Sequence, residues 1–373
     1  MVLATNLFID LLQVSLGNKD ALSKVPTEKH WEEMQDLAVV QTLTGVLLDG
    51  IERLPAEQRP TQDLLLEWIG ETLIIEAQNK QQRQVFQKAY SCLEKGGVKV
   101  AFMKGLVCGA RYPIPERREC GDIDFVVKDA FFSRTLDLLE EIGEVDQNLV
   151  HEHHGMVYVD DVLLEPHYKV HNFQNPRVDK AMKKLFGEVF PERLASVRIG
   201  DMDVPVFPSA FEGVILTGHM VNHVYADGLG LRQVVDFYYW IISNFVSNPG
   251  GTDFKDELWR GLRMLRMERA FRVFAYICEQ YMGLSSKVLR LDYTEKEKRT
   301  ANKLMEDIMA VGNFGRGECY LGDNHWLIPL RSYMWVLGRC WKLGSLCPAE
   351  ARWWPVSKLR RFWLKKIGCR KML

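Results

Sequence analysis

The run from Gly121 to Val127, GDIDFVV, constrains the fold of this chain more than any other segment. Polar and apolar residues alternate along it, and this alternation predicts a half-buried β-strand. Successive side chains of a strand point to opposite faces, so Asp122 and Asp124 share one face and the apolar side chains share the other. Two neighbouring carboxylates suit a divalent metal ion, because hard cations such as Mg²⁺ prefer oxygen ligands.

A third carboxylate stands further along the chain, in a second strand-like run. The runs 149–159 and 162–170 predict two strands joined by a tight hairpin at Asp160–Asp161. On the second strand, the two-residue period puts Glu165 and His167 on one face. If this strand neighbours the aspartate strand, Glu165 completes a carboxylate triad. Such a triad is typical of nucleotidyl transfer, in which two metal ions lie roughly 3.5 to 4 Å apart.

A Lys-Gly pair, Lys104 and Gly105, stands between a predicted strand at 98–103 and a predicted helix at 105–112. The first backbone N–H groups of a helix have no partner within it, and the helix dipole is positive there, so such a turn can hold phosphate oxygens. Gly105 lets the backbone approach a ligand closely. Lys104, and Arg118 on the loop before the aspartates, carry positive charges that can neutralise a triphosphate.

The chain divides by pattern into a small mixed core between two helical regions. Apolar residues recur at helical spacing up to residue 95, and the last helix of this region begins after Pro60–Thr61 and ends at Gly96–Gly97. Short strands and a helix at 131–142 follow, and the pattern is helical again from Ser209 onward. We therefore predict an α+β fold with a small mixed sheet flanked by helical regions. Its three parts are an N-terminal helical region at 1–96, a core at 97–207 and a C-terminal helical region at 208–373.

Four segments together carry a family resemblance: Lys104–Gly105, YPIPERR at 112–118, GDIDF at 121–125 and LEPH at 164–167. With them the chain resembles the uncharacterised nucleotidyltransferase family of bacteria, a branch of the DNA polymerase β-like nucleotidyltransferase superfamily. The likeness centres on residues 98–170, and helical flanks extend it over most of the chain. It implies a polymerase-β-like core that uses Mg²⁺ or Mn²⁺ to move a nucleoside monophosphate from a nucleoside triphosphate, such as ATP, to an unidentified hydroxyl acceptor.

The resemblance also implies roles for single residues. Asp122, Asp124 and Glu165 would be the catalytic carboxylates and the metal ligands. The nucleotide would be bound by Lys104, Gly105, Arg118, Gly121 and His167, the last of which would orient a carboxylate or act as a base. The wider superfamily has a Gly-Ser pair where this chain has Lys104–Gly105, so a serine hydroxyl for the phosphate is missing. A second interpretation therefore stays open, in which the chain keeps the fold as a nucleotide-binding or scaffold protein without transfer.

Histidines invite two further interpretations. Five of them cluster in sequence: His151, His153, His154, His167 and His171. Alternation divides the first three between both strand faces, and no cysteine stands at ligand spacing, so zinc is disfavoured. His219 and His223 are one helical turn apart, but a zinc-protease motif needs Glu directly after the first His, where Met220 stands. For this helix, with the later Arg232 and Asp236, substrate contact and helix packing with salt bridges both stay open.

The formal net charge of −1 conceals a basic C-terminal segment. Residues 352–373 hold eight Lys or Arg and no acidic residue, so the rest of the chain must carry −9. A global attraction to nucleic acid is therefore not supported. Because Trp and Phe are interleaved with the basic residues, three interpretations of the segment stay open: a packed helix with a solvated basic face, contact with an anionic membrane surface and, less favoured, contact with nucleic acid.

Composition indicates a cytoplasmic protein, peripheral at a membrane if the basic segment binds lipid. No apolar run reaches the roughly 18 residues that a membrane span needs. The N-terminal apolar stretch contains Asp10 and lacks the early basic cluster of a signal peptide. Eight cysteines are scattered along the chain without metal-ligand spacing, as expected of reduced thiols.

Overall fold

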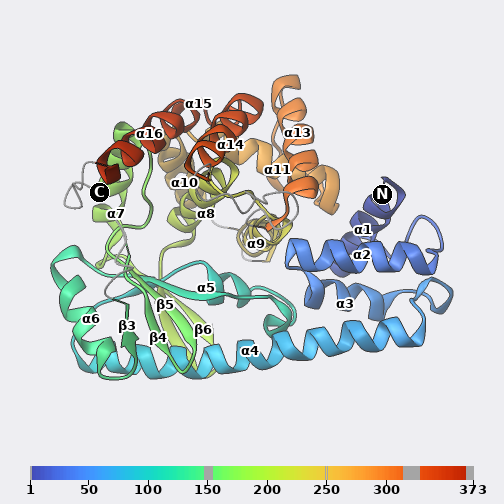
Figure 1. Cartoon of the computed structure of the whole chain (residues 1–373), viewed down its shortest axis with the longest axis horizontal. Coiled ribbons are helices and arrows are strands. Elements are labelled where there is room, and N and C mark those ends of the chain that lie inside the picture. Colours follow the sequence, from blue (N-terminus) through green and yellow to red (C-terminus); the bar gives the residue numbers. More distant parts are fainter. Residues whose placement is uncertain (1, 147–153, 248, 250, 314–327, 367–373) are drawn as a thin grey trace.

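Figure 1 shows the computed structural model of the chain, which describes all residues except 1, 147–153, 248, 250, 314–327 and 367–373. The N-terminal region consists of α1 (Val2–Ser15), α2 (Glu28–Gln41), α3 (Thr44–Arg53), the 3₁₀ turn η1 (Ala56–Gln58) and α4 (Gln62–Lys95). The predicted start of the long helix after Thr61 and its end at Gly96 are confirmed. With 34 residues, α4 runs beneath both the sheet and the N-terminal helices (Figure 1).

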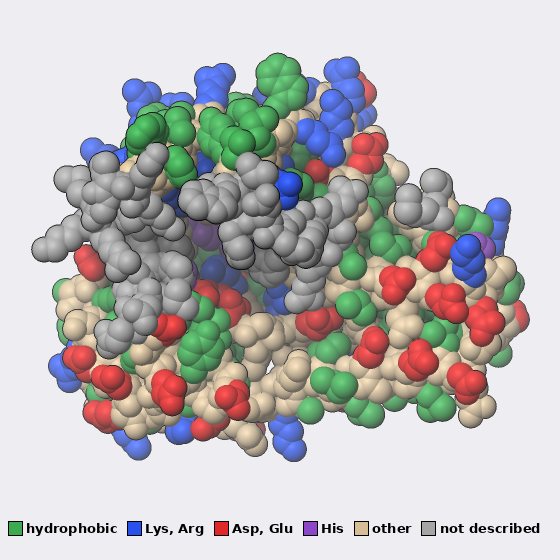
Figure 2. Space-filling view, in the orientation of Figure 1, with side chains coloured by type: hydrophobic (Ala, Val, Ile, Leu, Met, Phe, Trp, Pro, Cys, Tyr) green, Lys and Arg blue, Asp and Glu red, His purple; other side chains and the backbone are tan. Residues whose placement is uncertain are grey.

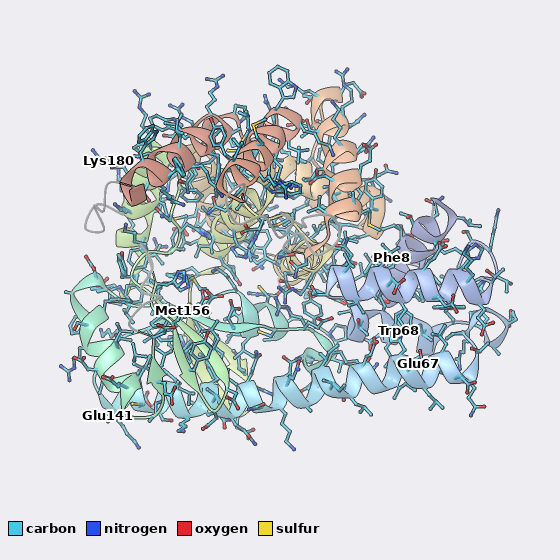
Figure 3. All side chains as sticks on the ribbon, viewed as in Figure 1. Phe8, Glu67, Trp68, Glu141, Met156 and Lys180 are labelled. Atoms are coloured by element: carbon cyan, nitrogen blue, oxygen red, sulfur yellow. The ribbon has the colours of Figure 1, made fainter. Side chains whose placement is uncertain are left out.

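Helix α4 takes part in two apolar cores. Near its start, Trp68 is fully buried against Trp31 of α2, and its indole N–H donates to the carbonyl of Thr44 at 2.8 Å. In Figure 3, Trp68 lies on the side of α4 that faces α2 and α3. Further along, Val85 and Phe86 are buried against the sheet. The division into 1–96, 97–207 and 208–373 stays a prediction. Helix α4 packs against both the N-terminal helices and the sheet, so it connects the first two of these parts.

The described strands form one seven-stranded mixed sheet in the order β3-β4-β5-β2-β1-β7-β6. The strands are β1 (Ala101–Phe102), β2 (Asp122–Val126), β3 (Glu144–Val145), β4 (Val157–Val159), β5 (Val162–His167), β6 (Ala195–Ile199) and β7 (Met202–Val206). The pairs β2/β5 and β1/β7 are parallel, and the other pairs are antiparallel. The predicted β4–β5 hairpin is confirmed: Asp160 and Asp161 both have positive φ, 49° and 63°, as a type I′ turn requires. The α+β class is therefore confirmed.

The two faces of the sheet have different covers. Ile123 and Phe125 of β2 belong to the core between the sheet and the helices α4 and α6 (Phe132–Glu140). Val126 belongs instead to the core that the sheet shares with the C-terminal helices. Asp122 and Asp124 have the same strand parity as Val126, so their side chains lie on the face turned toward those helices.

Helices dominate the rest of the chain. They are α5 (Gly105–Gly109), η2 (Pro115–Arg117), η3 (Asp129–Phe131), α7 (Pro176–Val189), α8 (Ser209–Tyr225), α9 (Leu231–Ile241), the π-helical η4 (Ile242–Ser247), α10 (Thr252–Leu265), α11 (Glu268–Met282), α12 (Ser286–Leu289), α13 (Glu295–Val311), α14 (Ile328–Leu343), α15 (Pro348–Ala351) and α16 (Trp353–Lys366). The helical pattern predicted from Ser209 onward is confirmed. Among the described residues, no helix has both the length and the apolar character needed to cross a bilayer.

The sequence pattern predicted no element between 171 and 208, where the structure has α7, β6 and β7. β6 is an edge strand with mostly exposed side chains, so it lacks the apolar alternation that marks a half-buried strand. Other predicted bounds were too long. Of 98–103 only Ala101–Phe102 pairs in the sheet, and the helix predicted at 105–112 ends at Gly109. Part of the strand predicted at 149–159 lies outside the described residues.

Candidate active site

The parallel pairing of β2 and β5 brings the three predicted carboxylates together. Asp124 lies opposite Glu165 in this register, and Asp122 is on the same face of β2. Each of the three side chains offers a carboxylate oxygen, and these oxygens lie within 4.8 Å of one another. On the face shown in Figure 2, acidic, basic and histidine side chains lie in a hollow between the sheet and the C-terminal helices.

The two aspartates have opposite electrostatic surroundings. Burial, together with the charges of Asp124 and Glu165, raises the pKa of Asp122 to about 7. Within the described residues, the Asp122 carboxylate forms no ion pair or hydrogen bond. Burial acts to raise the pKa of Asp124 as well, but Lys104 and His167 lower it well below its ordinary value. The half-buried Asp122 is therefore the member of the triad whose negative charge lacks a partner.

His167 and Lys104 bind the same oxygen of Asp124. The His167 Nε2–H donates to Oδ1 of Asp124 at 2.7 Å, and the Lys104 ammonium donates to the same atom at 2.9 Å. His167 Nε2 also lies 3.6 Å from an oxygen of Glu165. Burial acts to lower the pKa of His167, but its hydrogen bonds to the two carboxylates raise it. His167 thus holds Asp124 and Glu165 in place, and the second oxygen of Asp124 is not used in either contact.

Lys104 has a backbone conformation that side-chain-bearing residues rarely adopt. Its φ of 53° and ψ of −135° place it outside the common regions, immediately before α5. Such conformations cost roughly 1 to 3 kcal/mol and are retained where the surrounding structure enforces them. Burial acts to lower the pKa of Lys104, but the contact with Asp124 raises it. The strained backbone of Lys104 therefore places its charged ammonium group beside the carboxylates.

The two glycines of the predicted nucleotide site differ in their surroundings. A Cβ atom at Gly105 would lie 3.0 Å from the carbonyl oxygen of Asp122 and 3.1 Å from Sγ of Cys120. This close approach of α5 to the start of β2 therefore favours glycine at position 105. A Cβ at Gly121 would meet no atom within 4 Å, so open space adjoins it. Contact of Gly105 or Gly121 with a nucleotide stays a prediction.

Arg118 makes contacts that the sequence did not predict. Its guanidinium forms a bidentate ion pair with Asp236 of α9, with Nε–Oδ1 and Nη2–Oδ2 both at 2.7 Å. The hydroxyl of Tyr112 donates to the same carboxylate at 2.7 Å. Arg118 and Asp236 are 5% and 6% exposed, so this pair is sealed from water. Of the two interpretations that the sequence left open for Asp236, these contacts favour the salt bridge, while phosphate contact by Arg118 stays a prediction.

Comparison with known proteins confirms the family that the sequence resembles. The family model described as "Uncharacterised nucleotidyltransferase" matches residues 27–283, which is more than half of the chain. The chain belongs to this family. A comparison with curated protein sequences finds no match.

Two solved structures share a low level of likeness with this nucleotidyltransferase. One is the antibiotic-resistance factor ANT(2'')-Ia, with 12% identity, a TM-score of 0.35, and coverage of 55% of this chain and 99% of that one. The other is an antigenic nucleotidyltransferase-like protein from Paracoccidioides brasiliensis, with 12% identity, a TM-score of 0.31, and coverage of 59% of this chain and 96% of that one. Values this low carry no argument about substrate.

Helices α8 and α9 bring further polar groups to the nucleotidyltransferase site. His219 and His223 are in contact through their Nε2 atoms at 3.1 Å, and the His171 ring stacks on that of His219. Burial, together with the positive charges of Lys104 and Arg232, lowers the pKa of His223 to about 3. Burial and His223 lower the pKa of His219 as well. Both histidines are therefore neutral near pH 7.

Arg232 is the second cation close to the carboxylates. It donates to the carbonyl of Glu119 at 2.6 Å, and its charge lowers the pKa of Asp122. Its Nε is buried without a hydrogen-bond partner among the described residues. The sequence named Arg232 only through the family resemblance, with substrate contact and salt-bridge duty both left open, because its approach to β2 depends on how α9 packs.

The predicted histidine cluster is brought together in part. His151 and His153 lie outside the described residues. His154 forms an isolated bridge with His167, and the ligand atoms of His154, Glu165 and His167 lie within 4.8 Å of one another. His171 instead donates from Nε2 to the carbonyl of Ile215 at 2.9 Å, which ties the segment after β5 to α8.

Proposed function

We propose that this nucleotidyltransferase moves a nucleoside monophosphate from a nucleoside triphosphate to a hydroxyl acceptor in a metal-dependent reaction. The observation that carries the proposal is the register of β2 and β5, which sets Asp124 beside Glu165 with Asp122 on the same face. Packing alone does not require three carboxylates on one buried face, because each buried charge costs several kcal/mol unless it is compensated. A site that binds cationic ligands explains them.

The donor set fits Mg²⁺ or Mn²⁺. Asp122, Asp124 and Glu165 would hold the ions, since all three offer carboxylate oxygens and Asp122 forms no ion pair within the part of the chain that the structure describes. The chemistry that such ions supply is a lowered pKa of the attacking hydroxyl and neutralisation of the charge on the leaving pyrophosphate. His167 would keep the carboxylates oriented through its bonds to Asp124 and Glu165.

Lys104 and Arg232 would bind and orient the triphosphate, because both carry positive charge beside the carboxylates. The acceptor oxygen forms a bond to the α-phosphorus, and the bond from that phosphorus to the bridging oxygen of pyrophosphate breaks. Pyrophosphate leaves with the electron pair, and the hydroxyl proton is released to solvent. The neutral His219 and His223 would line the side toward α8, where hydrogen bonds rather than charges would select the acceptor.

The test compares Asp122→Asn and Asp124→Asn variants with the wild-type chain. Calorimetric titration with ATP, CTP, GTP and UTP in the presence of Mg²⁺ measures binding, and pyrophosphate release in the presence of cell extract measures transfer. We expect both to fall at least tenfold in the variants. The exposed Asp137→Asn on α6 is the matched control and should change neither. Unchanged Mg²⁺-dependent binding and turnover in a variant that carries both Asp122→Asn and Asp124→Asn would show that the mechanism is wrong.

A second candidate is a nucleotide-binding or scaffold protein without transfer, and one observation favours it. The ammonium of Lys104 lies 2.9 Å from Asp124, where it neutralises charge that a metal ion would otherwise neutralise. This interpretation predicts nucleotide binding without pyrophosphate release for the wild-type chain. It also predicts that Lys104→Met weakens nucleotide binding to the same degree with and without Mg²⁺.

A further inference from the structure

Helix α14 has an apolar face that the rest of the described chain does not cover. Leu330, Met334, Leu337 and Trp341 follow each other at helical spacing along one face, and they are 59%, 55%, 39% and 92% exposed. Exposed apolar residues scattered singly are normal, but a continuous row on one helix is not. The indole of Trp341 stands almost entirely in solvent, which indicates that this face has a partner.

Helix α16 adds a second exposed apolar row beside the first. The two helices pack against each other, and the buried Trp354 fixes α16 to the protein. Five of its large apolar side chains are nevertheless 40% to 56% exposed: Trp353, Val356, Leu359, Phe362 and Trp363. Figure 2 shows hydrophobic side chains gathered along the edge of the molecule where α14 and α16 lie, with Lys and Arg side chains on both sides. We refer to these nine residues as the α14–α16 surface.

The exposed charges that α14, α15 and α16 themselves bring to the α14–α16 surface are positive, and one of them, Lys342, also pairs with Asp307 of α13 at 3.2 Å. In residues 328–366 the single acidic residue is Glu350, which is fully buried and accepts the backbone N–H groups of Gln174 and Asn175. Among the side chains of this stretch that the structure describes, four basic ones are exposed: Arg331, Lys342, Arg352 and Arg360. The surface is therefore apolar at its centre and cationic at its border.

We propose that the α14–α16 surface binds the headgroup region of an anionic phospholipid bilayer. Helices that lie in the membrane interface combine an apolar face containing Trp, Phe and Leu with Lys and Arg beside it, and anionic headgroups complement that charge. The α14–α16 surface extends beyond the basic segment 352–373, because Trp341, the most exposed of its nine residues, belongs to α14. The proposal is independent of the transfer reaction.

Two other partners fit the surface less well. The bases of nucleic acid stack on exposed aromatic rings, but they cannot stack on aliphatic side chains such as Leu330, Leu337 and Val356. A second copy of the chain would cover the apolar residues, but it would bring two borders of positive charge together, and like charges at an interface are unfavourable.

Vesicle co-sedimentation of the full chain tests the proposal, with phosphatidylcholine vesicles compared with vesicles containing 30% phosphatidylglycerol. We expect binding to the anionic vesicles at low salt, at least tenfold weaker binding to the neutral ones, and a blue shift of Trp fluorescence on binding. Trp341→Ser with Trp363→Ser should lower binding at least tenfold while circular dichroism stays unchanged. The matched control, Leu73→Ser with Ile74→Ser on α4, removes side chains that are 58% and 61% exposed elsewhere and should leave binding unchanged.

A second, electrostatic arm needs no apolar substitution. Binding of the wild-type chain should weaken as salt rises, and Arg352→Glu with Arg360→Glu should weaken it at low salt. The proposal is wrong if the wild-type chain binds neither kind of vesicle, or if the control variant loses binding as strongly as the Trp variant. Binding to duplex or single-stranded DNA without vesicle binding would assign the surface to nucleic acid. Dimerisation in analytical ultracentrifugation that the Trp variant abolishes, without vesicle binding, would assign it to a second copy.

Discussion

The ion pair between Arg118 and Asp236 gives the sharpest test of how this site is held. Arg118 lies on the loop that leads to Asp122, and Asp236 lies on α9, so the pair links the start of β2 to the helices above it. The Arg118 carbonyl also accepts a hydrogen bond from Asn79 of α4 at 2.8 Å. Burial acts to raise the pKa of Asp236, but Arg118 and Tyr112 lower it, so both partners are charged near pH 7.

The expected magnitudes follow from the burial of the pair. Arg118→Met or Asp236→Leu alone leaves an unpaired buried charge, which costs about 3 to 5 kcal/mol of unfolding free energy. The double variant replaces both charges with apolar groups, and such replacements of a buried pair are often neutral. Its remaining cost is the Tyr112 hydroxyl, which loses its acceptor, at about 1 to 3 kcal/mol. The two substitutions should therefore couple by at least about 3 kcal/mol.

Urea unfolding of the four proteins, followed by circular dichroism and Trp fluorescence, measures this cycle. Calorimetric titration with nucleoside triphosphate on the same proteins separates the two roles of Arg118. If Arg118 only positions the loop, the double variant should regain both stability and nucleotide affinity. A double variant that regains this stability but fails to bind nucleotide would instead support the predicted phosphate contact of Arg118. Additive costs of the two single changes would refute the argument from burial.

Two further predictions concern stability. Burial raises the pKa of Glu350 from its ordinary value of 4.5 to about 7. The unfolding free energy that protonated Glu350 contributes is therefore fully present below pH 4.5 and is lost as pH rises through 7. Urea unfolding at pH 5 and pH 8 should show a smaller loss of unfolding free energy for Glu350→Gln than for the wild-type chain, by about 3 kcal/mol, because the contribution of Asp122 in the same pH range is common to both proteins. Gly45→Ala puts its Cβ on the backbone carbonyl of Arg117 and should destabilise the chain by about 1 to 3 kcal/mol in thermal unfolding. The matched change Gly70→Ala on the exposed side of α4 meets no atom within 4 Å and should stabilise by about 1 kcal/mol; equal effects of the two changes would contradict the packing argument.

The local sequence pattern was enough to predict the part of the site that lies on β2, namely Asp122 and Asp124. Strand alternation depends on adjacent residues, so the shared face of Asp122 and Asp124 follows from the sequence alone. The place of Glu165 followed only on the condition that its strand neighbours β2, and the register of β5 meets that condition. The β6–β7 hairpin was missed because edge strands carry a weak apolar signal and because β7 joins the sheet beside β1, far away in sequence.

The basic residues could not be assigned in this way. The sequence gives Lys104 and Arg118 the same role, since both precede the aspartates and both are cations. In the structure the two residues have different partners, because each side chain forms an ion pair with a different buried carboxylate. For Lys104 this is Asp124 within the core, and for Arg118 it is Asp236 on a helix more than one hundred residues away. Contacts of that sequence separation depend on the packing of whole elements, which local periodicity does not report.

The balance of charge bears on whether Lys104 substitutes for a metal ion. One ammonium group and one imidazole contact Asp124, and His167 also approaches Glu165. If these groups neutralised the whole triad, the charges of Asp124 and Glu165 would not raise the pKa of Asp122 further than burial does. Its pKa is instead raised to about 7, with burial and the charges of Asp124 and Glu165 as the causes. The charges of Asp124 and Glu165 therefore still act on Asp122 despite Lys104 and His167, and a carboxyl group that binds a proton this readily favours a site that binds further cations over one that Lys104 has already neutralised.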